Sequence, residues 1–223
     1  MPVLIGGFLG YVAGVGAWLV ARRFTGQYHA QPIHEREMQG LPLLHGVQGA
    51  ITLPAALTQA GMALWGVYAG WQAPGLPQMV SALVVTGVLV TITLVDFQAR
   101  HIPNGLGLAL MLWALVQPLW LGQPALIAAV LGLSIGGGLF LLLALIRRGA
   151  MGAGDVKLAA ALGVLLGYPL VLHGLFWGVL AAGVAALVLL ATRRAGRKDT
   201  MAYGPYLALG GWIIWTRSLG LWP

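Results

Sequence analysis

The sequence predicts an all-α protein, a polytopic membrane helix bundle with about eight transmembrane helices. Of its 223 residues, 59% are hydrophobic and 8% are charged, and the mean hydropathy is +0.87. Ordinary soluble domains carry about 25% charged residues. The apolar runs approach the ~20 residues that a helix needs to cross the hydrocarbon, and they lack the alternation of barrel strands. We therefore predict one transmembrane domain over residues 1–223.

The first apolar segment extends from Val3 to Val20 and is followed by two arginines at 22–23. A secretory signal carries its positive charge before the apolar core, whereas here the charge follows it. We therefore expect a retained anchor with its N-terminus outside. Gly6, Gly10 and Gly14 recur every fourth residue, which predicts a small-residue face for close helix packing.

Residues 22–46 form the longest polar stretch, and we expect a cytoplasmic loop that lies partly on the membrane surface. It contains three histidines and two glutamates, which are His29, His34, Glu35, Glu37 and His45. These side chains could bind a metal, but no pair has the spacing of a known site. We therefore favour a solvated loop and expect no metal. Because the chain has no cysteine, structural disulfides and thiolate metal sites are excluded.

Seven further segments follow in the same pattern. Their expected bounds are Val47–Gly70, Met79–Phe97, Gly105–Leu121, Ala125–Ile146, Asp155–Gly167, Leu170–Ala191 and Tyr203–Trp222. The second ends near Trp65, Tyr68 and Trp71, which are typical of an interfacial aromatic belt. In the fifth, Gly132 and Gly136 again predict close helix contacts.

The distribution of basic residues predicts the orientation. If the N-terminus is outside, the loops after the first, third, fifth and seventh segments are cytoplasmic. They hold every Lys and Arg except Arg217, counting Lys157 at the start of the sixth segment. This agrees with the positive-inside rule, so the net charge of +7 is interpreted as a topology signal and not as a nucleic-acid site. We expect a multi-pass protein of the bacterial inner (cytoplasmic) membrane.

Two of the five acidic residues lack a simple solvated explanation. Glu35 and Glu37 belong to the polar loop, and Asp199 follows a basic run. Asp96 ends the third segment and Asp155 begins the sixth, so the topology places both at the cytoplasmic ends of spans, at the same depth. A carboxyl group beside membrane-embedded sequence is a candidate functional group, because its burial costs about 2.5–3.5 kcal/mol on insertion scales.

Asp155 follows two glycines, Gly152 and Gly154, within the sequence Met-Gly-Ala-Gly-Asp-Val-Lys. Glycines adopt backbone angles that other residues avoid. We expect them to break the helix here and to leave amides free to point at a ligand or a substrate strand.

If Asp96 and Asp155 meet, they cannot both ionise comfortably, so they share a proton and titrate as a unit. The ionised member can take a proton from a water that attacks a peptide carbonyl, while the protonated member donates to the carbonyl oxygen. This chemistry needs no metal or cofactor. The alternative is that each aspartate caps a helix or pairs separately, Asp96 with Arg100 and Asp155 with Lys157.

Three motifs resemble those of the type IV prepilin peptidase family, the GxGD intramembrane aspartic proteases that cleave pilin and pseudopilin precursors. Residues 152–158 are similar to the family's Gly-x-Gly-Asp signature, and Asp96 with Ile102-Pro103-Asn104 is similar to its first aspartate with the trailing Ile-Pro-Asn/Asp. Residues 203–210 resemble the start of its last segment. The resemblance covers residues 79–211.

The resemblance implies an aspartic endopeptidase with Asp96 and Asp155 as catalytic residues. The supporting residues would be Gly152, Gly154, Lys157, Pro103, Gly204 and Pro205. Lys157 would neutralise nearby charge or orient the loop, or would only be a snorkelling topology residue. Gly204-Pro205 would break the start of the last helix beside the site, or would only form a turn.

The expected partners are membrane lipid and prepilins or pseudopilins with a short basic leader and a hydrophobic helix, cut at the cytoplasmic face. Longer members carry a cysteine-containing cytoplasmic domain between the first two spans, and they also N-methylate the product with S-adenosylmethionine. This chain resembles a short form without that domain. We therefore expect no cofactor, and S-adenosylmethionine would bind only if a methyltransferase activity were retained.

Two rival functions fit part of the pattern. Presenilin and signal-peptide-peptidase-like proteases also use a Gly-x-Gly-Asp loop, but they cut deep inside a helix, whereas Asp96 and Asp155 lie at the membrane boundary. A proton-coupled transporter could use the two aspartates as a relay. Such a protein is expected to place its carboxyl groups nearer the midplane of the bilayer.

Overall fold

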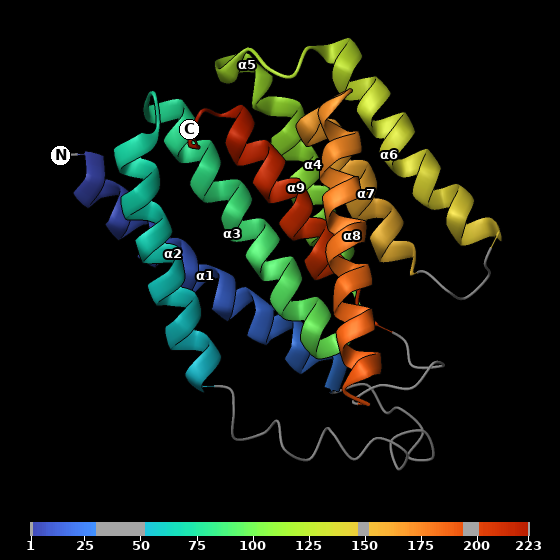
Figure 1. The fold of residues 1–223 in the computed structure, drawn as a ribbon. Helices are drawn as coiled ribbons and strands as arrows, with labels where there is room; N and C mark the ends of the chain where they lie inside the picture. Colours follow the sequence, from blue (N-terminus) through green and yellow to red (C-terminus); the bar gives the residue numbers. More distant parts are fainter. Residues whose placement is uncertain (1, 30–51, 147–151, 194–200, 223) are drawn as a thin grey trace.

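The computed structural model describes residues 2–29, 52–146, 152–193 and 201–222 (Figure 1). Within these residues the chain forms only α-helices and turns, with no strand. The helices are α1 (Pro2–His29), α2 (Thr52–Gln72), α3 (Leu76–Ala99), α4 (Asn104–Val116), α5 (Pro118–Leu121), α6 (Leu126–Ile146), α7 (Ala153–Leu166), α8 (Leu170–Ala191) and α9 (Gly204–Ser218). The predicted all-α bundle is therefore confirmed.

Five stretches of the described residues are long and apolar enough to cross a membrane. They are Pro2–Arg23, Leu76–Ala99, Asn104–Leu121, Leu126–Ile146 and Leu170–Ala191. The predicted second, sixth and eighth spans correspond to α2, α7 and α9, which are helical but are not among the five. With 14 and 15 residues, α7 and α9 are only about 21 and 23 Å long, shorter than the ~30 Å hydrocarbon layer.

Several predicted boundaries differ from the structure, two of them clearly. Helix α1 continues to His29, so the loop expected at residues 22–46 begins inside a helix, and its remainder lies outside the described residues. The fourth segment is divided into α4 and α5 between Gln117 and Pro118. Proline has no N–H to continue the hydrogen-bond pattern, which explains an interruption at this point.

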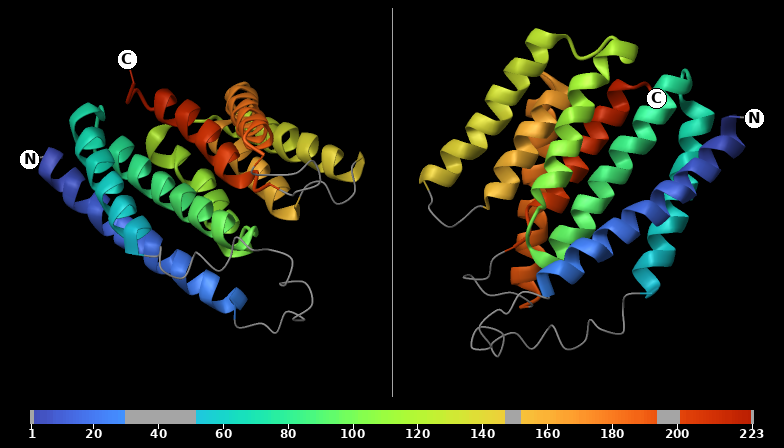
Figure 2. Two further views of the ribbon diagram at one scale, coloured as in Figure 1. Left: turned by 60° about the horizontal axis from the view of Figure 1, so that its bottom comes forward. Right: turned by 180° about the vertical axis from the view of Figure 1, so that it is seen from behind.

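The helices alternate in direction through the bundle (Figures 1 and 2). The C-terminal ends of α1, α3, α6 and α8 therefore lie on the same side as the N-terminal ends of α2, α4, α7 and α9. We call this the inner side, and it is the lower side of Figure 1. This is the arrangement that the alternating charge pattern predicts.

Small residues lie where helices cross, as predicted for α1. A Cβ atom built on Gly14 would come within 3.0 Å of the Gln59 Cα atom, and Gly6 and Gly10 lie even closer to the backbone of α2. In α6, Gly132 lies directly against the backbone of Gly163 in α7. Helices in lipid are held together by van der Waals packing, so such close contacts stabilise each pair.

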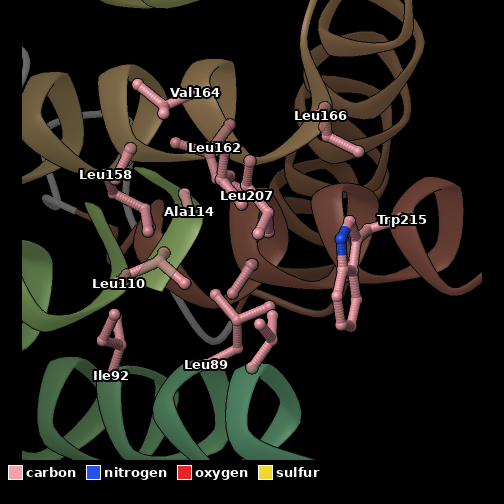
Figure 3. Packing of buried hydrophobic residues seen from close by; sticks show 14 of the residues in the cluster. Leu89, Ile92, Leu110, Ala114, Leu158, Leu162, Val164, Leu166, Leu207 and Trp215 are labelled. Atoms are coloured by element: carbon pink, nitrogen blue, oxygen red, sulfur yellow. The ribbon is translucent and has the colours of Figure 1, made fainter. Parts of the chain in front are cut away.

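Helix α7 is the centre of the second half of the bundle. It packs against α4, α6, α8 and α9, and nine of its 14 residues are buried. Figure 3 shows Leu158 and Leu162 of α7 among side chains of α3, α4 and α9, such as Leu89, Leu110 and Leu207. Because α7 is enclosed in this way, its N-terminus, which carries Asp155, has a fixed place.

Candidate active site

Asp96 lies in the last turn of α3 and is 4% exposed. Its Oδ2 atom accepts a hydrogen bond of 3.1 Å from the backbone N–H of Gly204, the first residue of α9. The helix ends just after it, because Arg100 adopts a left-handed conformation (φ 48°) and its N–H donates to the Asp96 carbonyl. A carboxylate buried in this way is stabilised by the partial positive charge of a helix N-terminus.

Asp155 lies in the first turn of α7 and is 9% exposed. Its Oδ2 atom accepts a hydrogen bond of 3.3 Å from the N–H of Gly152, and its own N–H donates to the Gly152 carbonyl at 3.1 Å. Asp155 therefore caps its own helix, as the separate-cap alternative predicted for each aspartate. Both carboxyl groups bind the amide of a glycine at a helix N-terminus.

The structure supports the predicted role of the glycine pair only in part. Gly152 has an extended conformation and is the N-cap before α7, as a helix break requires, but its amide donates to Asp155 and is not free for a ligand. Gly154 lies inside α7 and does not break the helix. The absence of a side chain at position 154 serves a close approach instead. A Cβ atom there would come within 3.0 Å of the Ile102 Cβ atom.

The structure brings the two aspartates together around Ile102. This residue is 4% exposed and contacts both Gly154, one residue before Asp155, and Gly204, the partner of Asp96. The two carboxyl groups lie within electrostatic range of one another. They come from the C-terminal end of α3 and the N-terminal end of α7, 59 residues apart in sequence. Both of these helix ends lie on the inner side of the bundle (Figure 1).

The other predicted supporting residues surround this pair. Pro103 is the N-cap of α4 and is buried. The Lys157 ammonium donates a hydrogen bond of 2.6 Å to the Asn104 Oδ1 atom, which links α7 to the start of α4 on the exposed surface. Pro205 is in the first turn of α9, where its missing N–H costs no helical hydrogen bond. Gly204-Pro205 therefore starts the last helix beside the site.

Sequence reasoning missed the packing role of Ile102 and the polar partner of Lys157. The available signal was the Ile-Pro-Asn sequence at 102–104, which places an apolar residue between a polar helix end and a helix start. No feature of the sequence indicated that the Gly204 amide would bind Asp96. It depends on where α9 begins relative to α3, which local sequence does not specify.

Several predicted residues lie outside the described residues. They include Asp199 and the polar-loop residues His34, Glu35, Glu37 and His45. Among the residues that the structure does describe, no group of three His, Asp or Glu side chains is placed to hold a metal ion.

This arrangement has the components of acid–base catalysis on water. Two buried carboxyl groups close enough to interact can share a proton and titrate as a coupled pair. A carboxylate has about four lone-pair positions, so each group can bind further hydrogen-bond donors besides its glycine amide. The pair can therefore bind a water molecule and exchange a proton with it.

Comparisons with known proteins identify the family of the chain. A sequence profile of the Type IV leader peptidase family matches residues 83–187, which include both aspartates. The chain is similar to a prepilin leader peptidase/N-methyltransferase of Aeromonas salmonicida (strain A449), with 31% identity over 205 residues, 83% of this chain and 69% of that protein. The chain belongs to the type IV leader peptidase family.

Other relatives in the family carry the same name. The protein from Neisseria gonorrhoeae is 34% identical over 164 residues, which are 71% of this chain and 56% of that protein. The Pseudomonas aeruginosa protein is 29% identical over 170 residues, 70% of this chain and 56% of its own length. The chain thus spans between about half and two thirds of these relatives. No solved structure matches it.

Proposed function

We propose that this chain is a prepilin leader peptidase, an aspartic endopeptidase that removes the short basic leader from type IV prepilins or pseudopilins at the cytoplasmic face of the inner membrane. The observation that carries the proposal is the juxtaposition of Asp96 and Asp155, from separate helices, around Ile102. Family membership supports the peptidase activity, since the similar proteins are named prepilin leader peptidases.

In the proposed mechanism, one carboxyl group of the pair is ionised and the other is protonated. The ionised group takes a proton from a bound water, whose oxygen forms a bond to the carbon of the scissile peptide. The protonated group gives its proton to the carbonyl oxygen, which yields a tetrahedral diol. The C–N bond then breaks: the nitrogen takes the proton held by the pair, and one hydroxyl of the diol returns its proton to the pair. The products are a carboxylic acid and an amine, one water has been consumed, and the pair is back in its starting state. The two roles are assigned to the pair and not to either residue.

The supporting residues hold this pair in position. The amides of Gly152 and Gly204 each fix one Oδ2 atom, and Ile102 sets the separation of the two helix starts. Lys157 and Asn104 tie α7 to α4 next to the pair. Orientation of this kind can supply several kcal/mol of a reaction barrier.

We propose peptidase activity alone, without a bound cofactor. The names of the relatives include an N-methyltransferase, but this chain has no cysteine and only a short interval between α1 and α2. S-adenosylmethionine is therefore not part of the proposed mechanism.

The experiment that tests the proposal replaces each carboxylate by its amide. In a detergent-solubilised preparation with a purified prepilin, Asp96→Asn and Asp155→Asn are each expected to lower the cleavage rate by at least ~100-fold, because an amide cannot exchange the proton. Asp199→Asn is the matched control and should retain most of the activity. The products are identified by mass spectrometry of the released leader. Normal cleavage by either of the first two variants would remove the aspartate-pair mechanism.

A further inference from the structure

An apolar groove of about 760 Å³ begins beside the aspartate pair. Its floor is α3 between positions 86 and 97, and its walls are α2 between 57 and 68 and α9 between 205 and 212, with Trp222 at one end. We call it the α2–α9 groove.

The walls of the α2–α9 groove stand apart. No described Cα atom of α2 lies within 8 Å of one in α9, although both helices contact α3. Helix α2 is attached to the bundle mainly through α1, which crosses α2 and α3 (Figures 1 and 2). Large apolar side chains on both walls remain exposed, with Leu64 on α2 71% exposed and Leu209 on α9 47% exposed. The groove is therefore open from the side.

The inner end of the groove is continuous with the candidate active site. Phe97, which follows Asp96 in sequence, and Pro205, which follows Gly204, both line it. Phe97 is 59% exposed. A molecule in the groove would therefore reach the aspartate pair without crossing another helix.

The other end is closed by an aromatic cluster of Trp65, Tyr68, Trp212 and Trp222. The Trp65 and Trp212 ring centroids are 4.8 Å apart, and those of Trp65 and Tyr68 are 5.6 Å apart. Hydrogen bonds anchor the cluster, from Trp212 Nε1 to Thr86 Oγ1 at 2.8 Å and from the Tyr68 hydroxyl to the Leu221 carbonyl at 2.7 Å. This aromatic cluster joins α2 to α9 and limits the depth of the groove.

The chemistry of the groove defines its occupant. Its floor is part of an apolar helix long enough to cross the membrane, and its lining is almost entirely aliphatic and aromatic. A peptide in such surroundings must satisfy its own backbone hydrogen bonds, so it must be helical. The floor from 86 to 97 is about 17 Å long, which matches roughly three turns of a helix.

We infer that the α2–α9 groove binds the apolar helix directly next to the scissile bond of the substrate, and this inference rests on the proposed function. The apolar helix lies along α3, its end nearest the cut is at Phe97 and Pro205, and the aromatic cluster sets how far it enters. The groove thus selects substrates by an apolar helix of about three turns and positions the cleaved bond at the aspartates.

Crosslinking tests the position of the substrate without requiring cleavage. Because the chain has no cysteine, single cysteines are placed on the two walls by Leu64→Cys and Leu209→Cys, in an Asp155→Asn background. The probe is a prepilin with one cysteine in its apolar helix, reconstituted with the variant in phospholipid vesicles and joined by a short bis-maleimide. The matched control is Leu187→Cys on α8, which is 67% exposed and outside the groove.

Crosslinked product is expected from both wall positions and not from Leu187→Cys. Equal yields at all three positions would overturn the inference, because the prepilin helix would then be colliding with the protein at random in the same bilayer. A lack of product at both wall positions would also overturn it and would leave lipid as the occupant.

Filling the groove tests its role in selection. Gly61 lines the groove, and a Cβ atom built there meets no atom within 4 Å. Gly61→Leu is expected to lower at least tenfold the ratio of kcat/KM for the prepilin to kcat/KM for a leader peptide without the apolar helix. Gly183→Leu in α8, where an added Cβ also meets nothing within 4 Å, is the control and should keep the ratio of the unsubstituted chain.

The two proposals fail differently. If the unsubstituted chain does not cleave the prepilin, the proposed peptidase function is wrong. The crosslinking experiment still shows in that case whether the apolar helix binds in the α2–α9 groove. If the chain cleaves the prepilin but Gly61→Leu leaves the ratio unchanged, the groove has no part in selection and the inference is wrong.

Discussion

At the scale of single residues, the site is built from carboxyl groups that would be costly to bury alone. A buried charge is tolerated when hydrogen bonds replace its water. The amide of Gly204 provides one such bond to Asp96, and that of Gly152 provides one to Asp155. At Gly204 a glycine is required by the close approach, since a Cβ atom there would lie 2.6 Å from the Asp96 Oδ2 atom, whereas a Cβ atom on Gly152 would be in ordinary contact with the Asp155 Oδ2 atom at 3.6 Å.

Gly204→Ala therefore tests how precisely Asp96 must be placed. The added methyl group has to push the carboxyl group away, and it also lies 3.0 Å from the Ile102 Cδ1 atom. Since a displacement of about 1 Å in a catalytic group can cost about 100-fold in rate, we expect kcat/KM for a prepilin to fall by about that factor. Gly183→Ala, where an added Cβ meets no atom within 4 Å, is the control. Full activity of Gly204→Ala would show that the position of Asp96 is not critical.

At the scale of elements, α7 determines where Asp155 lies. This helix is short and buried on most sides, so its position depends on its contacts and not on lipid. The closest contact is the crossing with α6, where Gly163 meets the backbone of Gly132. Neither glycine has a positive φ angle. Glycine is therefore required at both positions by the short distance between the two helix backbones and not by the backbone conformation.

Gly163→Val is expected to separate α6 from α7 and to destabilise the bundle. The branched side chain would meet the Gly132 backbone, which cannot move aside as a side chain could. Overpacking typically costs 1–3 kcal/mol and occasionally more, and here we expect at least ~3 kcal/mol. The measurement is the thermal unfolding midpoint in detergent, with Gly183→Val as the control. An unchanged midpoint would contradict the observed crossing.

At the scale of the whole molecule, the alternating helices bring the C-terminal end of α3 and the N-terminal ends of α7 and α9 to one side of the bundle (Figure 1). The aspartate pair and the inner end of the α2–α9 groove therefore lie on this side. The ends of α1 and α8, with Arg22, Arg23 and Arg193, are on this same inner side. The positive-inside rule predicts that this side is cytoplasmic. A substrate with a basic leader would then be cut on the side where its leader remains.

Single cysteines test this orientation, since the chain has none of its own. Pro74→Cys, between α2 and α3, should react with a membrane-impermeant maleimide added to right-side-out spheroplasts. Thr192→Cys, at the end of α8, should react only after the membrane is opened with detergent. Both native residues are exposed, so burial does not explain a difference. The reverse labelling pattern would place the aspartates on the outer face and exclude the proposed site of cleavage.

The sequence by itself determined the helical membrane fold, the alternation of the segments and the choice of Asp96 and Asp155 as candidate site residues. These follow from composition, from the length of apolar runs and from the rarity of carboxyl groups in apolar surroundings, all of which are local properties. The tertiary structure alone decided that Gly154 serves contact with Ile102, that the Gly204 amide binds Asp96, and that α2 and α9 stand apart to leave a groove. These depend on how helices distant in sequence cross, and crossing distances are set by the packing of both partners together.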